Sequence, residues 1–308
     1  MTDLEAIRTG GKRALAGALA RIESSEGLYE MAPLLDAALA SPKGLCLGLT
    51  GPPGVGKSTL IDAIIKGWRA EGRTVGVIAV DPSSRRTGGA LLGDRTRLAT
   101  DPDDAGVFVR SMAAGEQLGG ISAATFPAMV LMRALYDLVL IETVGVGQSE
   151  TEISEIADLT AFCAQPGSGD ALQFMKAGVM EVPDIFIVTK SDMGPVARRT
   201  VADLKGALSL TSRGELPAIY ACSATTGEGL DTLLHGICEN IAQISPDFSE
   251  QRNQKAIRWA KGQISLKFGT EGQKFVPMDP VDNPEDHPFW GMTRRILRLS
   301  EAMTAAFR

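Results

Sequence analysis

The stretch GLCLGLTGPPGVGKSTLIDAIIKGW, residues 44–68, limits the possible folds more than any other part of this sequence. An apolar run typical of a buried strand passes through a glycine- and proline-rich loop into a segment with helical apolar spacing. Within it, Gly51, Gly56, Lys57 and Ser58 fit the pattern G-x-x-x-x-G-K-[ST]. The backbone N–H groups of such a loop, together with the positive end of the following helix, cradle phosphates. The stretch therefore predicts a strand, a phosphate-binding loop and a helix in succession.

The pattern also predicts roles for single side chains. Lys57 would reach the β- and γ-phosphates of a nucleotide, and the Ser58 hydroxyl would hold Mg²⁺. The alternative, a glycine-rich turn without a ligand, needs the lysine and the serine at these offsets by chance. We expect the following residues to contact the nucleotide: Gly51, Pro52, Pro53, Gly54, Val55, Gly56, Lys57, Ser58 and Thr59.

Short apolar runs rich in β-branched residues alternate with helical segments between residues 43 and 245. This alternation predicts an α/β domain with a doubly wound, mostly parallel sheet and ligands at the carboxyl ends of its strands. We expect strands at 45–49, 75–80, 107–110, 138–141, 159–164, 185–189 and 218–222, with helices at 57–70, 122–135, 170–177, 196–208 and 230–244.

Helical extensions are expected on both sides of this domain. The N-terminal extension, residues 1–42, should contain helices at 4–24 and 28–40. The C-terminal extension, residues 246–308, should contain a helix at 251–267, a proline-rich acidic loop and a closing helix. This arm is mildly basic, which solvated helix faces explain most simply; the alternative is dimerisation or contact with a partner.

Composition excludes several classes of protein. The net charge of −6 argues against a nucleic-acid binder. No apolar run approaches the ~20 residues that span a bilayer, and the N-terminus lacks the apolar core of a signal peptide. Because the four cysteines are scattered, we expect reduced thiols and a cytoplasmic location. The two histidines form no Cys/His cluster with metal-ligand spacing, which argues against a transition-metal centre.

The segment VLIETVGVGQSE follows the fourth predicted strand and carries Glu142 and Gly145. The Glu142 carboxylate suits Mg²⁺ or its water, and the Gly145 N–H suits the γ-phosphate. A buried acid at a strand end is the alternative. We expect Lys57, Glu142 and Gly145 to act at the reacting phosphate. Hydrolysis should be slow, because Val146 stands where many G proteins carry a glutamine that orients water.

The segment IFIVTKSD predicts which base is bound. Thr189, Lys190 and Asp192 fit [NT]-K-x-D, in which the aspartate accepts two hydrogen bonds from guanine. Adenine offers no matching pair of donors, so the carboxylate would be left unpaired against it. The motif therefore predicts GTP and GDP as ligands. Further along, a backbone N–H of Ser223, Ala224 or Thr225 would meet guanine O6.

The segment VDPSSRRTGGALLGDRTRL follows the second predicted strand and contains Asp81 and Asp94. Its composition fits two interpretations equally. It is typical of an exposed loop whose aspartates cap turns and a helix. It is equally typical of a switch loop whose acids approach Mg²⁺.

Taken together, GPPGVGKST, DPSSRRTGGALLGDRTR, ETVGVGQSE, PGSGDALQFMKAGVMEVPDI and TKSD resemble the MeaB/ArgK-type G proteins. These GTPases chaperone adenosylcobalamin-dependent acyl-CoA mutases such as methylmalonyl-CoA mutase. The resemblance runs from about residue 10 to 265. It implies a homodimeric P-loop GTPase whose nucleotide state controls loading of cobalamin onto the mutase and protection or repair of that enzyme.

The resemblance also implies roles for individual residues. Asp81, Asp94 and Glu142 would surround the metal with Ser58. Residues 166–176 match the family's third switch, which includes Asp170, Gln173 and Lys176. Thr189 replaces the commoner asparagine, and the last forty or so residues match no C-terminal dimerisation helix. The alternatives are an ATPase or kinase linked to amino-acid transport, which TKSD disfavours, and a metallochaperone GTPase, which would need Cys/His clusters.

Overall fold

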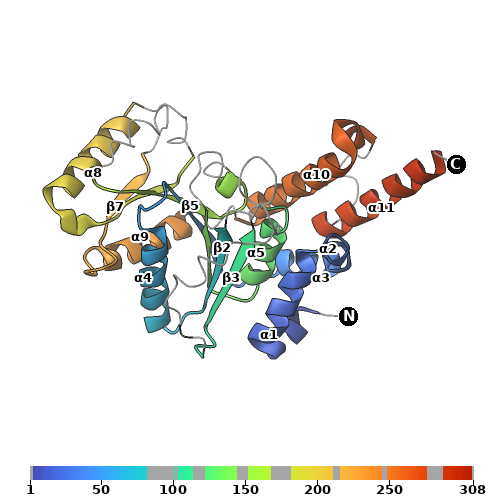
Figure 1. Cartoon of the computed structure of the whole chain (residues 1–308), viewed down its shortest axis with the longest axis horizontal. Coiled ribbons are helices and arrows are strands. Elements are labelled where there is room, and N and C mark those ends of the chain that lie inside the picture. Colours follow the sequence, from blue (N-terminus) through green and yellow to red (C-terminus); the bar gives the residue numbers. More distant parts are fainter. Residues whose placement is uncertain are drawn as a thin grey trace. The chain divides into compact units, whose positions relative to one another are not determined.

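The computed structural model describes residues 3–81, 101, 103–113, 122–143, 152–167, 182–210, 216–244, 248–275 and 287–306 (Figure 1). In these ranges seven strands form one sheet in the order β3-β2-β4-β1-β5-β6-β7, and every neighbouring pair is parallel. The strands are β1 (Leu45–Thr50), β2 (Val75–Asp81), β3 (Val107–Ala113), β4 (Leu138–Glu142), β5 (Leu159–Ala164), β6 (Ile185–Val188) and β7 (Ala218–Ala221). The predicted doubly wound parallel sheet is confirmed.

Helices precede, connect and follow these strands. They are α1 (Leu4–Ile22), α2 (Ser25–Glu30), α3 (Ala32–Ala40), α4 (Lys57–Ala70), α5 (Thr125–Arg133), α8 (Pro195–Leu208), α9 (Leu230–Ile244), α10 (Phe248–Phe275) and α11 (Pro288–Ala306). Within the described ranges, η1 (Ile153–Glu155) and η3 (Ser191–Met193) are short 3₁₀ helices. The helix predicted at 170–177 lies outside the described residues. Within the described part of the chain, no helix has the length and apolar character needed to cross a membrane.

The helix expected over 28–40 is wrong in one respect, because the chain forms two helices that meet at Met31. Ser24 begins the first of them, and its hydroxyl accepts a hydrogen bond from Gly27 N at 3.2 Å. Pro33 stands in the first turn of the second. A proline has no N–H to donate inside a continuous helix and its ring clashes with the preceding turn, so the helix must restart there.

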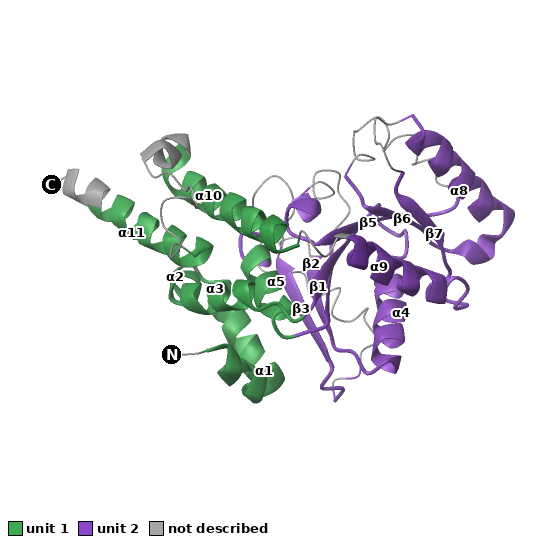
Figure 2. Ribbon diagram, turned by 180° about the vertical axis from the view of Figure 1, so that it is seen from behind, with its two compact units in different colours: residues 1–43, 126–135, 247–308 green, residues 44–125, 136–246 purple. Residues whose placement is uncertain are grey.

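Contacts divide the chain into two compact units, coloured separately in Figure 2. Unit 1 comprises residues 1–43, 126–135 and 247–308, and unit 2 comprises residues 44–125 and 136–246. The two predicted helical extensions both fall in unit 1, together with most of α5. The segments predicted to bind nucleotide all fall in unit 2.

Both faces of the unit 2 sheet are covered by helices. Alternate residues of β5 and β6 point to opposite faces, so Cys163 and Phe162 belong to different apolar clusters. The first cluster joins the sheet to α4 and α9, and the second joins it to α8. The central strands β1, β4, β5 and β6 are buried almost throughout, so they read as continuous apolar runs rather than as alternating ones.

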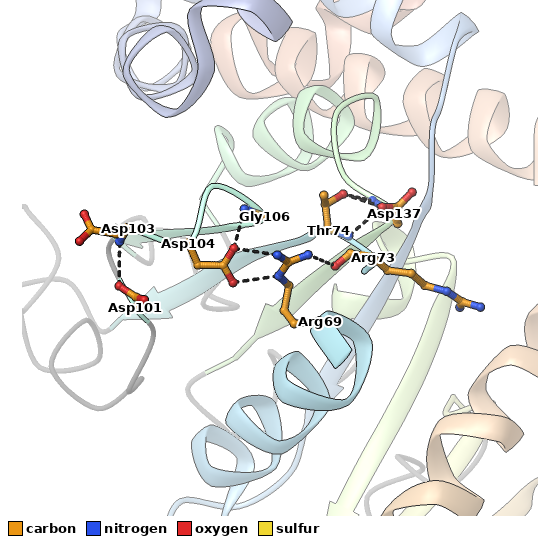
Figure 3. Close-up of polar contacts among 8 residues, drawn as sticks. All are labelled: Arg69, Arg73, Thr74, Asp101, Asp103, Asp104, Gly106 and Asp137. Atoms are coloured by element: carbon orange, nitrogen blue, oxygen red, sulfur yellow. Dashed lines mark hydrogen bonds and ion pairs between the residues drawn. The ribbon is translucent and has the colours of Figure 1, made fainter. Parts of the chain in front are cut away.

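A polar network fixes the amino end of the sheet (Figure 3). Arg69, in the last turn of α4, donates two hydrogen bonds of 2.8 Å to the Asp104 carboxylate, which precedes β3. A Cβ on Gly106 would lie 2.3 Å from the Arg69 Cζ atom, so a larger residue here would displace the Arg69 guanidinium. Nearby, Asp137 accepts hydrogen bonds from Thr74 N and Thr74 Oγ1 at 2.7 and 2.6 Å. Arg69 also donates to Arg73 O at 2.8 Å, so the far end of α4 is anchored to the segments before β2 and β3. The bonds between Thr74 and Asp137 join the starts of β2 and β4.

Unit 1 is held together by aromatic rings and one buried carboxylate. Trp259 of α10 lies 5.6 Å from Phe126 of α5 and 5.1 Å from Phe289 of α11, measured between ring centroids. Asp36, in the middle of α3, accepts hydrogen bonds from Phe289 N at 3.0 Å and Trp290 N at 2.8 Å. It therefore caps the start of α11 from another helix. Burial raises the pKa of Asp36 to about 6, although the two N–H donors and His287 oppose the shift.

Unit 1 should lose stability as the pH rises through the range in which Asp36 ionises. The pKa of Asp36 in the folded protein, about 6, exceeds the ordinary value of 3.8. The contribution of the protonated carboxyl to the free energy of unfolding is therefore complete below pH 3.8 and is lost as the pH rises through 6. The full loss is of the order of 3 kcal/mol for a shift of roughly two units. We expect the advantage of the wild type over Asp36→Asn in thermal unfolding to shrink between pH 4 and pH 7. An advantage that grows with pH would contradict this assignment.

Candidate nucleotide site

The loop between β1 and α4 has the backbone shape that its glycines suggest. Gly51, Gly54 and Gly56 adopt φ values of 135°, 76° and 104°, which residues with side chains rarely adopt. A Cβ on Gly51 would lie 2.4 Å from the carbonyl oxygen of Cys163, so the loop passes directly against the end of β5. Gly56 forms the start of α4 in the left-handed conformation. These positions require glycine for conformation and for close approach.

The carbonyl oxygens of this loop accept hydrogen bonds from protein donors. Lys57 Nζ donates to Gly51 O at 2.8 Å and to Pro52 O at 3.2 Å, and the side chain is 6% exposed. Two further carbonyls, of Gly54 and Val55, accept from side chains that follow β6. Because these carbonyl oxygens already accept from protein donors, the loop can direct its backbone N–H groups toward an anion.

Ser58 and Glu142 meet where α4 begins and β4 ends. Ser58 Oγ donates to Glu142 Oε1 at 2.9 Å, and Glu142 is buried. Glu142 pairs in register with Leu49 of β1 and with Ala79 of β2, so its place at the carboxyl edge follows from the sheet. Asp81 is the last residue of β2, two positions beyond Ala79. The structure thus brings together Ser58 and Glu142, two of the predicted metal ligands. It places the backbone of a third, Asp81, at the end of β2, the strand next to β4.

The TKSD segment interlocks with the phosphate loop. Thr189 Oγ1 donates to Val55 O at 2.7 Å and to Ala164 O at 3.2 Å. Lys190 Nζ donates to Gly54 O at 3.1 Å and to Gln165 Oε1 at 3.0 Å. The predicted base-binding motif and the predicted phosphate-binding loop are therefore joined by direct hydrogen bonds, although more than 130 residues separate them in the sequence.

The remaining residues of the predicted base site lie beside this motif. Asp192 is exposed, in η3. Ser191 N donates to Cys222 O at 3.1 Å, which joins η3 to the end of β7. Ser223 is buried, and its hydroxyl accepts from Thr226 N at 3.2 Å within the turn that also holds Ala224 and Thr225. The carboxyl ends of β6 and β7 therefore present both parts of the predicted base site on one edge of the sheet.

Five predicted site residues lie outside the described part of the chain: Gly145, Asp94, Asp170, Gln173 and Lys176. Of Asp81 only the backbone is described. In the described ranges, no group of three or more His, Cys, Asp and Glu side chains is arranged to hold a metal ion.

Gln165 is a residue of this site that the sequence did not single out. It follows β5 and accepts a hydrogen bond from Lys190 Nζ. The available signal was a polar residue at the carboxyl end of a wholly buried strand, where parallel sheets collect ligand-binding side chains.

The buried cysteines near the loop are not nucleophiles. Burial raises the pKa of Cys163 to about 12, a rise that Lys57 opposes and that Cys222 and Glu142 increase. Burial also raises the pKa of Cys222 to about 11. Both side chains remain thiols at neutral pH, so the chemistry of this edge belongs to lysine, hydroxyl and carboxylate groups.

Comparison with known proteins agrees with this geometry. A family model described as methylmalonyl Co-A mutase-associated GTPase MeaB matches residues 15–269. A protein of Pyrococcus horikoshii that is named as a GTPase is 43% identical over 248 residues, which cover 77% of this chain and 76% of its own. GTPase ArgK of Escherichia coli is 36% identical over 268 residues, which cover 83% of this chain and 81% of its own.

A solved structure extends the likeness to the whole fold. The crystal structure of an LAO/AO transport system kinase matches with a TM-score of 0.69 and 28% identity, covering 98% of this chain and 96% of that one. The family match, the two relatives and this structure confirm the resemblance that the motifs predicted. The chain has the fold of a P-loop GTPase and belongs to the MeaB family of methylmalonyl-CoA mutase-associated GTPases.

Proposed function

We propose that this GTPase is a chaperone whose nucleotide state gates cofactor loading onto an adenosylcobalamin-dependent acyl-CoA mutase, such as methylmalonyl-CoA mutase, and protects or reactivates it. The proposal takes the mutase from the description of the family that the chain matches. The observation that carries its nucleotide part is the direct bonding of Thr189 and Lys190 to the loop carbonyls of Val55 and Gly54. A phosphate loop tied to a TKSD motif suits guanine nucleotides.

In this proposal Lys57 and the loop N–H groups hold the phosphates. Lys57 begins α4, where the positive end of the helix dipole favours an anion. Its ammonium lies against the loop and would stabilise the charge that builds up as the γ-phosphate leaves. Gly145, from the sequence pattern, would donate its N–H to the same phosphate. Glu142 would orient the metal or its water.

The oxygen atoms of Ser58 and Glu142 fit Mg²⁺, because a hydroxyl and a carboxylate are the hard ligands that this ion prefers. Asp81 and Asp94 complete the set implied by the family resemblance. When bound, Mg²⁺ would neutralise charge on the β- and γ-phosphates. Ser58 and Glu142, whose side chains already meet, would hold the ion.

Guanine would be read by Asp192, with the Lys190 stem along the base plane. The exposed position of Asp192 leaves its carboxylate accessible to a ligand. A backbone N–H of Ser223, Ala224 or Thr225 would meet guanine O6. Nucleotides with adenine would leave the Asp192 carboxylate without its two donors.

The mutase would read the nucleotide state through Asp170, Gln173 and Lys176, the residues that match the family's third switch. We also propose a homodimer and a cytoplasmic location. Support for the dimer comes from α11, where Trp290 and Leu297 are 42% and 52% exposed on one side of the helix. A second chain that packed on this side of α11 would cover both side chains.

Asp192→Asn should exchange guanine for xanthine. We expect GTP binding to weaken by roughly 2–4 kcal/mol, because the amide cannot accept both guanine donors. Xanthosine triphosphate should bind this variant better than GTP does, since its 2-carbonyl accepts from the new amide. Calorimetric titration of both nucleotides into both proteins measures this. Asp203→Asn, at an exposed position in α8, is the control and should leave both affinities unchanged. Unchanged GTP affinity in Asp192→Asn would remove the guanine assignment.

Lys176→Ala should separate nucleotide binding from communication with the mutase. Intrinsic turnover should lie well below ~1 s⁻¹ and rise when the mutase docks. We expect the variant to bind GTP nearly as the wild type does, because Lys176 does not hold phosphate in this proposal. It should lose the mutase-stimulated hydrolysis and the nucleotide-dependent cofactor loading.

The control for this test is Lys205→Ala, which removes an exposed lysine from α8. Turnover is measured with saturating methylmalonyl-CoA mutase and with each variant. Stimulation that survives in Lys176→Ala would show that segment 166–176 is not the switch.

A further inference from the structure

The end of β5 contacts both halves of the proposed nucleotide site. The carbonyl of Cys163 lies against Gly51 of the phosphate loop. The next carbonyl, of Ala164, accepts from Thr189 N at 2.9 Å and from Thr189 Oγ1 at 3.2 Å. The following side chain, Gln165, accepts from Lys190 Nζ. Three consecutive residues therefore touch the loop, the threonine and the lysine in turn.

Lys190 needs positioning more than most lysines do. Its φ and ψ angles are 53° and 44°, and within the described residues it is the one residue other than glycine with a positive φ. This conformation costs about 1–2 kcal/mol for a residue with a side chain, so neighbouring bonds must hold it. The ammonium spans two acceptors, Gly54 O and Gln165 Oε1, and thereby connects the phosphate loop to the end of β5.

The two acceptors differ in their exposure to solvent. The bond to Gly54 lies in an exposed environment, whereas the bond to Gln165 is partly buried. Water replaces a lost acceptor more readily at the exposed bond than at the shielded one. Loss of the Gln165 acceptor should therefore affect Lys190 more than loss of the Gly54 acceptor, because water replaces it less readily.

The backbone that follows Gln165 contacts α8. Pro166 follows, and Gly167 N then donates to Thr200 Oγ1 of α8 at 3.4 Å. Gly167 also takes a positive φ of 76° against Val196 of α8. The chain just after β5 is thus held to α8 through Gly167.

We propose that Gln165 is a positioning residue that helps the protein to retain its nucleotide. Gln165 holds the Lys190 ammonium beside the Gly54 carbonyl, and the lysine stem is thereby fixed along the plane of the base. This inference rests on the proposed guanine-nucleotide site. The base is common to GTP and GDP, so Gln165 slows the release of both nucleotides. It acts through Lys190 and does not touch the reacting phosphate.

Two substitutions separate hydrogen bonding from packing. Gln165→Met keeps the length of the side chain and removes the acceptor, while Gln165→Glu keeps an acceptor and adds charge. We expect Gln165→Met to release fluorescent N-methylanthraniloyl-GDP and the corresponding GTP about 5- to 10-fold faster than the wild type. Gln165→Glu should release both at the wild-type rate or more slowly. The increase in release rate should exceed any change in the single-turnover rate of hydrolysis.

A double-mutant cycle assigns the effect to Lys190. In a Lys190→Met background, Gln165→Met should change the release rate less than 2-fold, because the partner is already gone. Thermal unfolding without nucleotide reports whether either variant damages the fold. The proposal is overturned if Gln165→Met releases nucleotide at the wild-type rate, if Gln165→Glu behaves like Gln165→Met, or if the effect persists without Lys190. If the wild type holds no guanine nucleotide, the proposed function itself fails.

Discussion

The hydrogen bonds from Thr189 and Lys190 to the carbonyls of Val55 and Gly54 are the contacts on which the rest of the site depends. They set the distance between the place where phosphates would lie and the place where a base would lie. Thr189 and Lys190 donate to the carbonyls of Val55 and Gly54, while Lys57 donates to those of Gly51 and Pro52. The loop is therefore shaped by the protein before any nucleotide arrives, which lowers the cost of ordering it on binding.

The sheet makes these contacts possible. β1 lies between β4 and β5, so the loop that follows it is flanked by the ends of both neighbours. On one side Glu142 reaches Ser58, and on the other the end of β5 reaches Gly51 and Thr189. The helix that begins at the loop is anchored at its far end by Arg69 and Asp104. Both ends of α4 are thus fixed to the sheet, and the position of Lys57 follows from that.

Much of unit 2 could be predicted because its signals are local. Buried parallel strands are apolar throughout, and the glycines of the loop adopt the positive φ angles that their spacing implies. The pairing of Ser58 with Glu142 also follows, since strand ends converge on one edge. Gln165 was missed because nothing nearby in sequence indicates its partner, Lys190. Its contact exists only once β5 and β6 are paired.

Unit 1 was harder to predict, because its main contacts also join residues that are far apart in the sequence. Asp36 reads as an ordinary polar position in a helix, yet it caps α11, more than 250 residues away. The triad of Phe126, Trp259 and Phe289 likewise joins three distant segments. Periodicity finds such helices, but it carries no information on which distant helix covers which face. The break between α2 and α3 was foreseeable, since Pro33 marks it.

The central claim is that unit 2 binds guanine nucleotides in preference to adenine nucleotides. Its most direct test is titration of the full chain with GTP and with ATP, each with Mg²⁺, under the same conditions. We expect GTP to bind at least about 100-fold more tightly than ATP, because ATP leaves the Asp192 carboxylate without its donors. Equal affinity for the two nucleotides, or tighter binding of ATP, would contradict it.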